Sequence, residues 1–299
     1  MDASTLMNGI RQGDQRALAR GISWVENQHP QGLELLKLTG KKVPLIGITG
    51  APGAGKSSLV NALVSHWVSK GYRVAILAID PSSPFHLGAL LGDRLRMPGL
   101  FLEESVFIRS IAARGSLGGL SASIMEVCDL VQEGPFDRII VETVGVGQSE
   151  IEIAGLADTT LVLTVPEGGD DVQALKSGVM EIADVFAVNK CDRPGSEAML
   201  RHLRELAHTH AQSSWEVPVI GTVATQGEGI EALDEALESH RKSGHISAKK
   251  QHLLMEKAYQ LIQRNRMRGV HKEILKKQLA SAQTKPGFNL YDFVNNYDA

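Results

Sequence analysis

Hydrophobic residues recur at helical spacing at the start of the chain, with charged residues between them. The apolar positions are Leu6, Ile10, Leu18, Ile22 and Val25. This spacing predicts an amphipathic helical opening that ends at the break formed by His29 and Pro30. A second short helix is predicted over 31–38.

From residue 43 the pattern changes to short apolar runs that end in Gly, Asp, Asn or Ser, as buried strands do. The runs cover 43–49, 73–80, 137–142, 159–165, 184–189 and 217–220. Helical patterns separate them, over 57–70, 117–133, 171–182, 196–210 and 229–242. This alternation predicts an α/β fold, with a mostly parallel sheet covered by helices on both faces.

Beyond residue 244 only helical spacing remains, in two pieces that meet near Arg268 and Gly269. We therefore expect three parts in the chain. They are an N-terminal helical segment over 1–41, an α/β domain over 42–243 and a C-terminal helical arm over 244–299.

Composition narrows the class of protein. The 299 residues are 43% hydrophobic and 22% charged, which is ordinary for a globular protein and excludes a disordered or collagen-like chain. Cys128 and Cys191 form no CxxC or Cys/His cluster, so we expect a reducing, cytoplasmic location. The stretches free of charged residues are too short for a membrane span of about 20 residues.

The net charge of −3 is unevenly distributed. Residues 244–299 hold ten Lys/Arg and only four Asp/Glu, so the arm is basic and the rest of the chain is acidic. A basic arm can bind nucleic acid or a membrane surface, or it can be the solvated face of ordinary helices. Apolar residues at helical spacing within it favour a dimerising helical arm, with no nucleic acid and no membrane as partner.

A glycine-rich loop carries the clearest chemistry. The run GAPGAGKS at 50–57 matches GxxxxGK[ST] between a predicted strand and a predicted helix, the context in which backbone N–H groups surround a phosphate. Lys56 is expected to contact the outer phosphates and Ser57 to ligate Mg²⁺. The expected nucleotide-binding residues here are Gly50, Ala51, Pro52, Gly53, Ala54, Gly55, Lys56, Ser57 and Ser58.

A second motif favours GTP over ATP. Asn189, Lys190 and Asp192 belong to NKCD, which follows a predicted strand at the ligand-binding end of the sheet. The Asp192 carboxylate can accept hydrogen bonds from guanine N1 and N2, which adenine does not offer. Asn189 can hold the loop, and the Lys190 stem can pack on the base. Thr222, Val223 and Ala224 follow the last predicted strand and can present backbone N–H groups to guanine O6.

Acidic residues end two strands beside the glycine-rich loop. Asp80 and Glu142 are therefore candidate Mg²⁺ ligands, with Asp93 as a third, although strand-end acids can also simply face solvent. The run ETVG at 142–145 stands where many GTPases have DxxG, so Gly145 is a candidate contact of the γ-phosphate. We assign Lys56, Glu142 and Asp93 as the candidate catalytic residues.

Two polar, glycine-containing stretches are candidate switches. The longer, over 81–104, contains Asp93 and Arg94, which can act on metal and phosphate or form a surface ion pair. The second is 168–171, which opens a predicted helix carrying Gln173 and Lys176. Its acids can instead cap that helix.

Together these runs resemble the MeaB/ArgK family of P-loop GTPases, the methylmalonyl-CoA mutase-associated proteins formerly described as lysine/arginine/ornithine transport kinases. The matching runs are DPSSPF (80–85), LGDR (91–94), RGSLGGLS (114–121), ETVGVGQSE (142–150) and NKCD (189–192). Glu142 in place of Asp is then a family trait. The chain departs from the family at His86-Leu87, where small residues are more usual.

The resemblance implies a GTPase that helps to load cofactor into an adenosylcobalamin-dependent acyl-CoA mutase and protects it from inactivation. It also implies slow hydrolysis without the mutase and a homodimer through the C-terminal arm. Two alternatives remain at this stage. One is an ATP-dependent kinase serving amino-acid transport, and the other is a nickel-insertion GTPase.

Overall fold

The computed structural model describes residues 2–80, 97, 99–100, 102–112, 123–143, 149–166, 181–209 and 215–244. It also describes most of 255–297, with gaps at 257, 260, 264–265, 268, 271 and 285–286. The chain forms two compact units, Met1–Lys250 and Gln251–Ala299.

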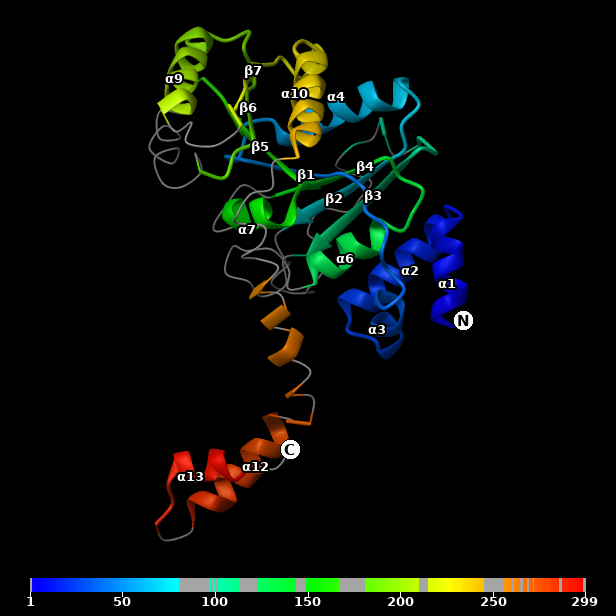
Figure 1. Ribbon diagram of the computed structural model, residues 1–299, viewed down its shortest axis with the longest axis vertical. Helices are drawn as coiled ribbons and strands as arrows, with labels where there is room; N and C mark the ends of the chain where they lie inside the picture. The colour runs from blue at the N-terminus through cyan, green and yellow to red at the C-terminus, as the bar shows by residue number, and fades with distance from the viewer. Residues whose placement is uncertain are drawn as a thin grey trace. The chain divides into compact units, whose positions relative to one another are not determined.

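The first unit is built on a sheet of seven described strands in the order β3-β2-β4-β1-β5-β6-β7 (Figure 1). The strands are β1 (Leu45–Gly50), β2 (Val74–Asp80), β3 (Val106–Ala112), β4 (Arg138–Glu142), β5 (Thr159–Thr164), β6 (Val185–Val188) and β7 (Val219–Gly221). Every neighbouring pair is parallel. The predicted α/β class is therefore confirmed, and the described sheet is wholly parallel.

The edge strand β3 was not expected from the sequence. Its residues Arg109 and Ser110 interrupt the apolar run that marks the other strands. In the structure Leu77 of β2 pairs with Arg109, and the guanidinium lies 3.4 Å from the Glu26 carboxylate. The edge strand tolerates this arginine because the acidic side chain of Glu26 lies close to it. The strand therefore includes polar residues and does not appear in the sequence as an apolar run.

Helices cover both faces of the sheet. The described helices of the first unit are α1 (Ala3–Arg11), α2 (Gln15–Glu26), α3 (Pro30–Leu36), α4 (Lys56–Ser69), α6 (Ile124–Val131), α7 (Ser149–Leu156), α9 (Ser196–Thr209) and α10 (Ile230–Ser243). Leu77 and Val141 pack in the core with α1–α3, α6 and α7, whereas Ile76 and Ile140 pack with α4 and α10. Neighbouring strand residues thus face opposite cores, as the pleat requires.

The start of the N-terminal segment forms two helices where the pattern predicted one. The expected single opening helix is divided into α1 and α2 at residues 12–14. Gly13 has a φ of 87°, in the left-handed region that glycine adopts easily. The Asp14 side chain then caps α2 by accepting hydrogen bonds from the N–H groups of Arg16 and Ala17. The prediction of one helix was wrong because the apolar spacing continues across this turn.

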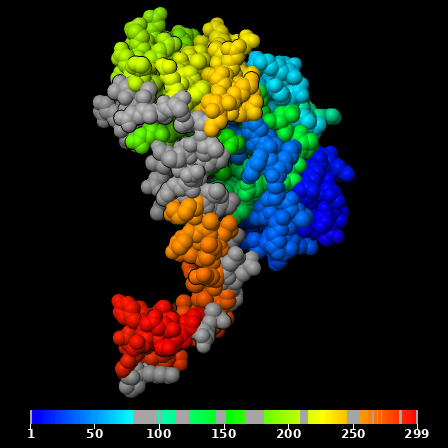
Figure 2. Space-filling view, viewed as in Figure 1, coloured from blue at the N-terminus to red at the C-terminus, as the bar shows by residue number. Residues whose placement is uncertain are grey.

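A buried carboxylate attaches the N-terminal helices to the sheet domain. Glu133, only 4% exposed, accepts hydrogen bonds from the N–H groups of Gly40 and Lys41 and pairs with Arg11. Burial opposes its charge, but these donors hold the pKa of Glu133 below its ordinary value. The helices form part of the surface of this unit, in dark blue in Figure 2.

A second buried carboxylate links α4, β4 and α10. Asp234 accepts hydrogen bonds from Trp67 Nε1 at 2.8 Å, Arg138 Nη1 at 2.8 Å and Lys70 Nζ at 3.0 Å. The Arg138 guanidinium lies over the rings of Trp67 and Tyr72, 4.6 and 4.7 Å from their centroids. One charge on α10 therefore has donors on β4 and at the C-terminal end of α4, and α10 is held against α4.

The second unit contains α12 (Lys272–Gln283) and α13 (Leu290–Asn295). The helix α13 follows Pro286 and Gly287, residue types that commonly end a helix. Large apolar side chains are about half exposed or more in this unit. They include Met255 (51%), Tyr259 (56%), Ile262 (51%), Ile274 (49%) and Val294 (61%).

Among the helices that the structure describes, none combines the length and the apolar character needed to span a bilayer.

Replacing Asp234 with Asn should lower the free energy of unfolding at pH 7 by about 3 kcal/mol, because Arg138 and Lys70 lose a buried counter-charge. Although burial disfavours the Asp234 charge, hydrogen bonds from Trp67 and Lys70 and the charge of Arg138 hold its pKa below the usual 3.8. The stabilisation is thus complete above that pH and is lost as the pH falls through the folded-state pKa. Urea unfolding at several pH values measures it.

The matched control is Glu235→Gln, an exposed acid on the same helix, which should change stability by less than about 0.5 kcal/mol. Equal losses for the two variants, or a loss for Asp234→Asn that stays constant down to pH 3, would contradict the assigned role of this cluster.

Candidate nucleotide site

The glycine-rich loop leaves the sheet at the carboxyl end of β1. Gly50 has a φ of 147°, and a Cβ built there would lie 2.1 Å from the carbonyl oxygen of Leu163 on β5. Only glycine fits so close to the neighbouring strand, which explains why the motif begins at this position. The loop then opens α4 at Lys56, so the first N–H groups of that helix point toward the loop.

Two further glycines of the loop are in the left-handed region but have different surroundings. Gly53 has a φ of 79° and open space where a Cβ would be. Gly55 has a φ of 91°, and its Cβ would lie 2.5 Å from Asn189 Nδ2. The loop therefore packs directly against the NKCD motif, which lies far away in sequence.

Lys56 is folded over its own loop. Its side chain is 7% exposed, and Nζ donates to the carbonyl oxygens of Gly50 at 2.7 Å and Ala51 at 3.0 Å. The ammonium group is thus held at the concave side of the loop, where a phosphate would accept from it.

The side chains of Ser57, near the start of α4, and Glu142, at the end of β4, are in contact. The Ser57 hydroxyl donates to Glu142 Oε1 at 2.6 Å, and Glu142 is 2% exposed. Glu142 is the last residue of β4 and pairs in register with Ile48 of β1 and Ala78 of β2. A buried carboxylate and a hydroxyl so close together offer two oxygen ligands of the kind that Mg²⁺ prefers.

Asn189 holds three segments together. Its Nδ2 donates to the Ala54 carbonyl at 3.0 Å, and its Oδ1 accepts from the Ala224 N–H at 3.1 Å and the Thr222 hydroxyl at 3.3 Å. It is 3% exposed, so all of these bonds are buried. The side chain thus joins the phosphate loop to the segment after β7.

The remaining residues of the motif are more exposed. Lys190, with a φ of 59°, reaches across to the carbonyl of Gly53 at 2.9 Å. Asp192 is exposed beside it. Cys191 donates to the Val188 carbonyl, and burial raises the pKa of its thiol, so it packs as a neutral group.

The N–H groups after β7 already have acceptors within the chain. Thr222 donates to the Val188 carbonyl, Val223 to Glu228 and Ala224 to Asn189 Oδ1. A contact with guanine O6 through this segment would require one of these bonds to exchange. The predicted role of residues 222–224 in base recognition stays a prediction.

Several predicted site residues fall outside the described part of the chain. These residues are Asp93, Arg94, Gly145, Gln173 and Lys176. Most of the candidate switch over 81–104 and all of the one over 168–171 also lie outside the described part. Asp80 ends β2 next to the β4 strand, but only its backbone is described.

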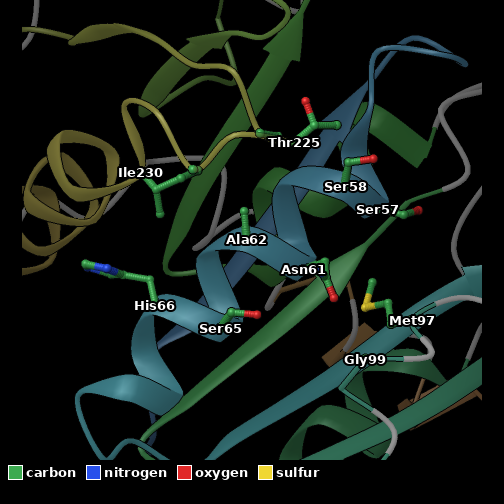
Figure 3. A pocket seen from close by; sticks show the side chains of 12 residues that line it. Ser57, Ser58, Asn61, Ala62, Ser65, His66, Met97, Gly99, Thr225 and Ile230 are labelled. Atoms are coloured by element: carbon green, nitrogen blue, oxygen red, sulfur yellow. The ribbon is translucent and has the colours of Figure 1, made fainter.

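A pocket of about 640 Å³, lined by polar and apolar residues, adjoins the glycine-rich loop. Figure 3 shows Ser58, Asn61 and Ser65 along one wall, all from α4, with Thr225 and Ile230 across from them. The pocket thus shares Ser57, Ser58 and Ala224 with the expected nucleotide-binding residues.

Two buried threonines at this end of the sheet were not expected. Thr49 precedes the loop, Thr143 follows Glu142, and the Thr143 hydroxyl donates to that of Thr49 at 2.9 Å. They are 0% and 1% exposed. The sequence signals are slight: Thr49 ends an apolar run, Thr143 follows the acid that ends another, and neither reveals its partner.

The fold and the site define a P-loop nucleoside triphosphatase. A solved structure described as an LAO/AO transport system kinase matches 98% of this chain and 95% of its own, with a TM-score of 0.69 and 25% identity. HypB of Helicobacter pylori in complex with nickel matches 77% of this chain and 98% of its own, with a TM-score of 0.52. At 17% identity, that second match shows the fold alone.

The chain belongs to the family described as methylmalonyl-CoA mutase-associated GTPase MeaB, whose model matches residues 18–281. GTPase ArgK of Escherichia coli is 38% identical, over 76% of this chain and 72% of its own. The mouse mitochondrial methylmalonic aciduria type A homolog is 32% identical, over 87% and 69%. The family resemblance is confirmed, and the protein is a GTPase.

Gly55→Ala should destabilise the nucleotide-free protein more than Gly53→Ala. Both substitutions place a side chain in the left-handed region, at about 1–2 kcal/mol each, but only the first also displaces Asn189. We expect an additional loss of at least about 1 kcal/mol for Gly55→Ala. Chemical unfolding of the two variants measures the difference.

Asn189→Ala provides the check. On the Gly55→Ala background it removes the clash, so it should cost less free energy of unfolding than it does alone. Additive losses in this double-mutant cycle would show that the loop and Asn189 are not in contact.

Proposed function

We propose that this GTPase uses Lys56, Ser57 and Glu142 to hydrolyse Mg²⁺-GTP and serves an adenosylcobalamin-dependent acyl-CoA mutase in cofactor loading and protection. The observation that supports the chemistry best is the 2.6 Å contact between Ser57 and the buried Glu142. The observation that supports the partner is the match to the mutase-associated family over residues 18–281.

In this proposal the glycine-rich loop binds the phosphates. Backbone N–H groups at the start of α4 face the anion, and the dipole of that helix favours negative charge there. Lys56 Nζ, now on the loop carbonyls, donates to the outer phosphate oxygens instead. The chain thus supplies fixed positive charge where negative charge develops during phosphoryl transfer.

The donor set beside the loop fits a hard divalent cation. Ser57 Oγ and Glu142 Oε1 would hold Mg²⁺, directly or through water, with Asp80 and Asp93 as further proposed ligands. When bound, Mg²⁺ neutralises charge on the β- and γ-phosphates. Glu142 is longer than the Asp of DxxG and already accepts from Ser57, so its position is set before any metal arrives.

Hydrolysis then depends on positioning rather than on a strong base. Our expected catalytic set of Lys56, Glu142 and Asp93 contains no neutral amine or imidazole that could take a proton from water. We therefore propose a low intrinsic rate, which association with the mutase raises by completing the site.

Base selection is assigned to the NKCD motif. The exposed Asp192 carboxylate would accept from guanine N1 and N2, and Asn189 keeps the motif against the phosphate loop through Ala54. GTP and GDP are therefore the proposed nucleotides, and ATP lacks the matching donors.

GTP should displace bound GDP far better than ATP does. Asp192→Asn should weaken GTP binding by about ten- to hundredfold, because hydrogen bonds to a charged acceptor are lost. Competition with a fluorescent GDP analogue measures both effects, with the exposed Glu197→Gln variant as control. Equal displacement by ATP would favour the transport-kinase function suggested by the LAO/AO match.

The C-terminal unit is the proposed dimer element. Its half-exposed apolar side chains, among them Tyr259 and Ile274, would be covered by a second copy, and the Lys and Arg residues would remain in water or face an acidic partner. The proposed location is the cytoplasm, on the sequence argument that Cys128 and Cys191 form no CxxC or Cys/His cluster.

The mutase role is tested by co-purification. We expect a complex with a methylmalonyl-CoA-type mutase that forms differently in GDP and in a non-hydrolysable GTP analogue, and we expect Lys56→Ala to abolish that difference. Gel filtration with both nucleotides measures it. If no complex forms in either nucleotide state, the chaperone role fails while the GTPase assignment stands.

The nickel-insertion alternative gains no support from the site. Among the described residues, no group of three or more His, Cys, Asp or Glu side chains is arranged to hold a metal ion. The likeness to HypB is one of fold.

A further inference from the structure

Thr49 and Thr143 form a hydroxyl pair between the two strands that carry the site. Their oxygens lie 2.9 Å apart, and both side chains are buried. Valine has a similar shape and would be buried without the cost of enclosing a hydroxyl. The packing of the sheet alone therefore does not require hydroxyls at these two positions.

The pair lies between the two elements of the proposed chemistry. Thr49 directly precedes Gly50, where the phosphate loop begins, and Thr143 directly follows Glu142. The regular β1–β4 register ends at Ile48 and Glu142, and the Thr143 N–H donates to the Ile48 carbonyl at 3.0 Å. The hydroxyl bond thus extends the connection between the strands one residue past the register.

This extension joins the two strands at the residues from which each chain leaves the sheet. Beyond Thr143 the chain enters 144–148, and beyond Thr49 it enters the loop that leads to Ser57. Since Ser57 must meet Glu142 at 2.6 Å, a small change in the angle at which either segment leaves the sheet would separate the two oxygens.

We propose that Thr143 is a positioning residue for GTP hydrolysis: through Thr49, it holds the Glu142 carboxylate against Ser57. This inference rests on the proposed role of Ser57 and Glu142 in Mg²⁺-GTP hydrolysis. It assigns the hydroxyl pair to the metal side of the site, because its proposed effect is on the contact between Ser57 and Glu142.

The test is Thr143→Val, with Thr143→Ser to restore the hydroxyl. We expect Thr143→Val to lower the single-turnover rate at saturating GTP by about three- to tenfold, and to raise the Mg²⁺ concentration for half-maximal rate by a similar factor. GDP affinity in EDTA should stay within about twofold of the wild type, and Thr143→Ser should restore both quantities. Thr49→Val should match Thr143→Val, and the double variant should be no worse than either.

Thr159→Val is the matched structural control. Its hydroxyl bonds to His240 at 2.8 Å in the core, at the amino end of β5, so its loss should lower stability without changing the rate or the Mg²⁺ requirement. If Thr143→Val does not fold, Thr49→Val removes the same bond from the other strand and is held to the same outcomes.

Three results would overturn the inference. They are a wild-type rate and Mg²⁺ requirement for Thr143→Val, a loss of GDP affinity in EDTA as large as the loss of rate, or additive losses in the double variant. Absence of GTP hydrolysis by the wild-type protein would contradict the proposed function itself. That outcome is seen without any variant, so it is distinguishable from a failure of the inference on Thr143.

Discussion

The parallel pairing of β1 with β4 is the constraint on which the site depends. The register of Ile48 with Glu142 brings a carboxylate to the point where the phosphate loop begins, although the two lie almost a hundred positions apart. Because Gly50 lies so close to the Leu163 carbonyl, β5 fixes the other side of the same loop. Loop, hydroxyl and carboxylate thus take their geometry from three neighbouring strands of one sheet.

Much of this arrangement could be predicted from local sequence. Apolar runs of strand length mark β1, β2 and β4–β7, and the glycine-rich run identifies the loop because its backbone conformation requires glycine. The motif order and the strand ends place Asn189 at the same edge of the sheet as the loop, and its contact with the Ala54 carbonyl lies there. These features depend on short segments and on the general geometry of parallel sheets.

Long-range side-chain contacts could not be predicted. The edge strand β3 was missed because Arg109 breaks its apolar run, and the sequence does not reveal that Glu26 lies beside this guanidinium. The turn at Gly13 leaves the apolar spacing intact, so periodicity does not reveal it. The Thr49–Thr143 pair and the Asp234 cluster join residues whose own neighbourhoods in sequence look ordinary.

The attachment of the N-terminal helices has a consequence for synthesis on the ribosome. Arg11 and its partner Glu133 are 122 positions apart in the chain. The N-terminal helices are made first, so they can dock onto the sheet domain only after α6 and Glu133 have left the ribosome. At a translation rate of about 5–20 residues per second, their apolar faces are exposed for on the order of ten seconds. The first helices of the nascent chain are therefore a natural substrate for general chaperones while the sheet is being made.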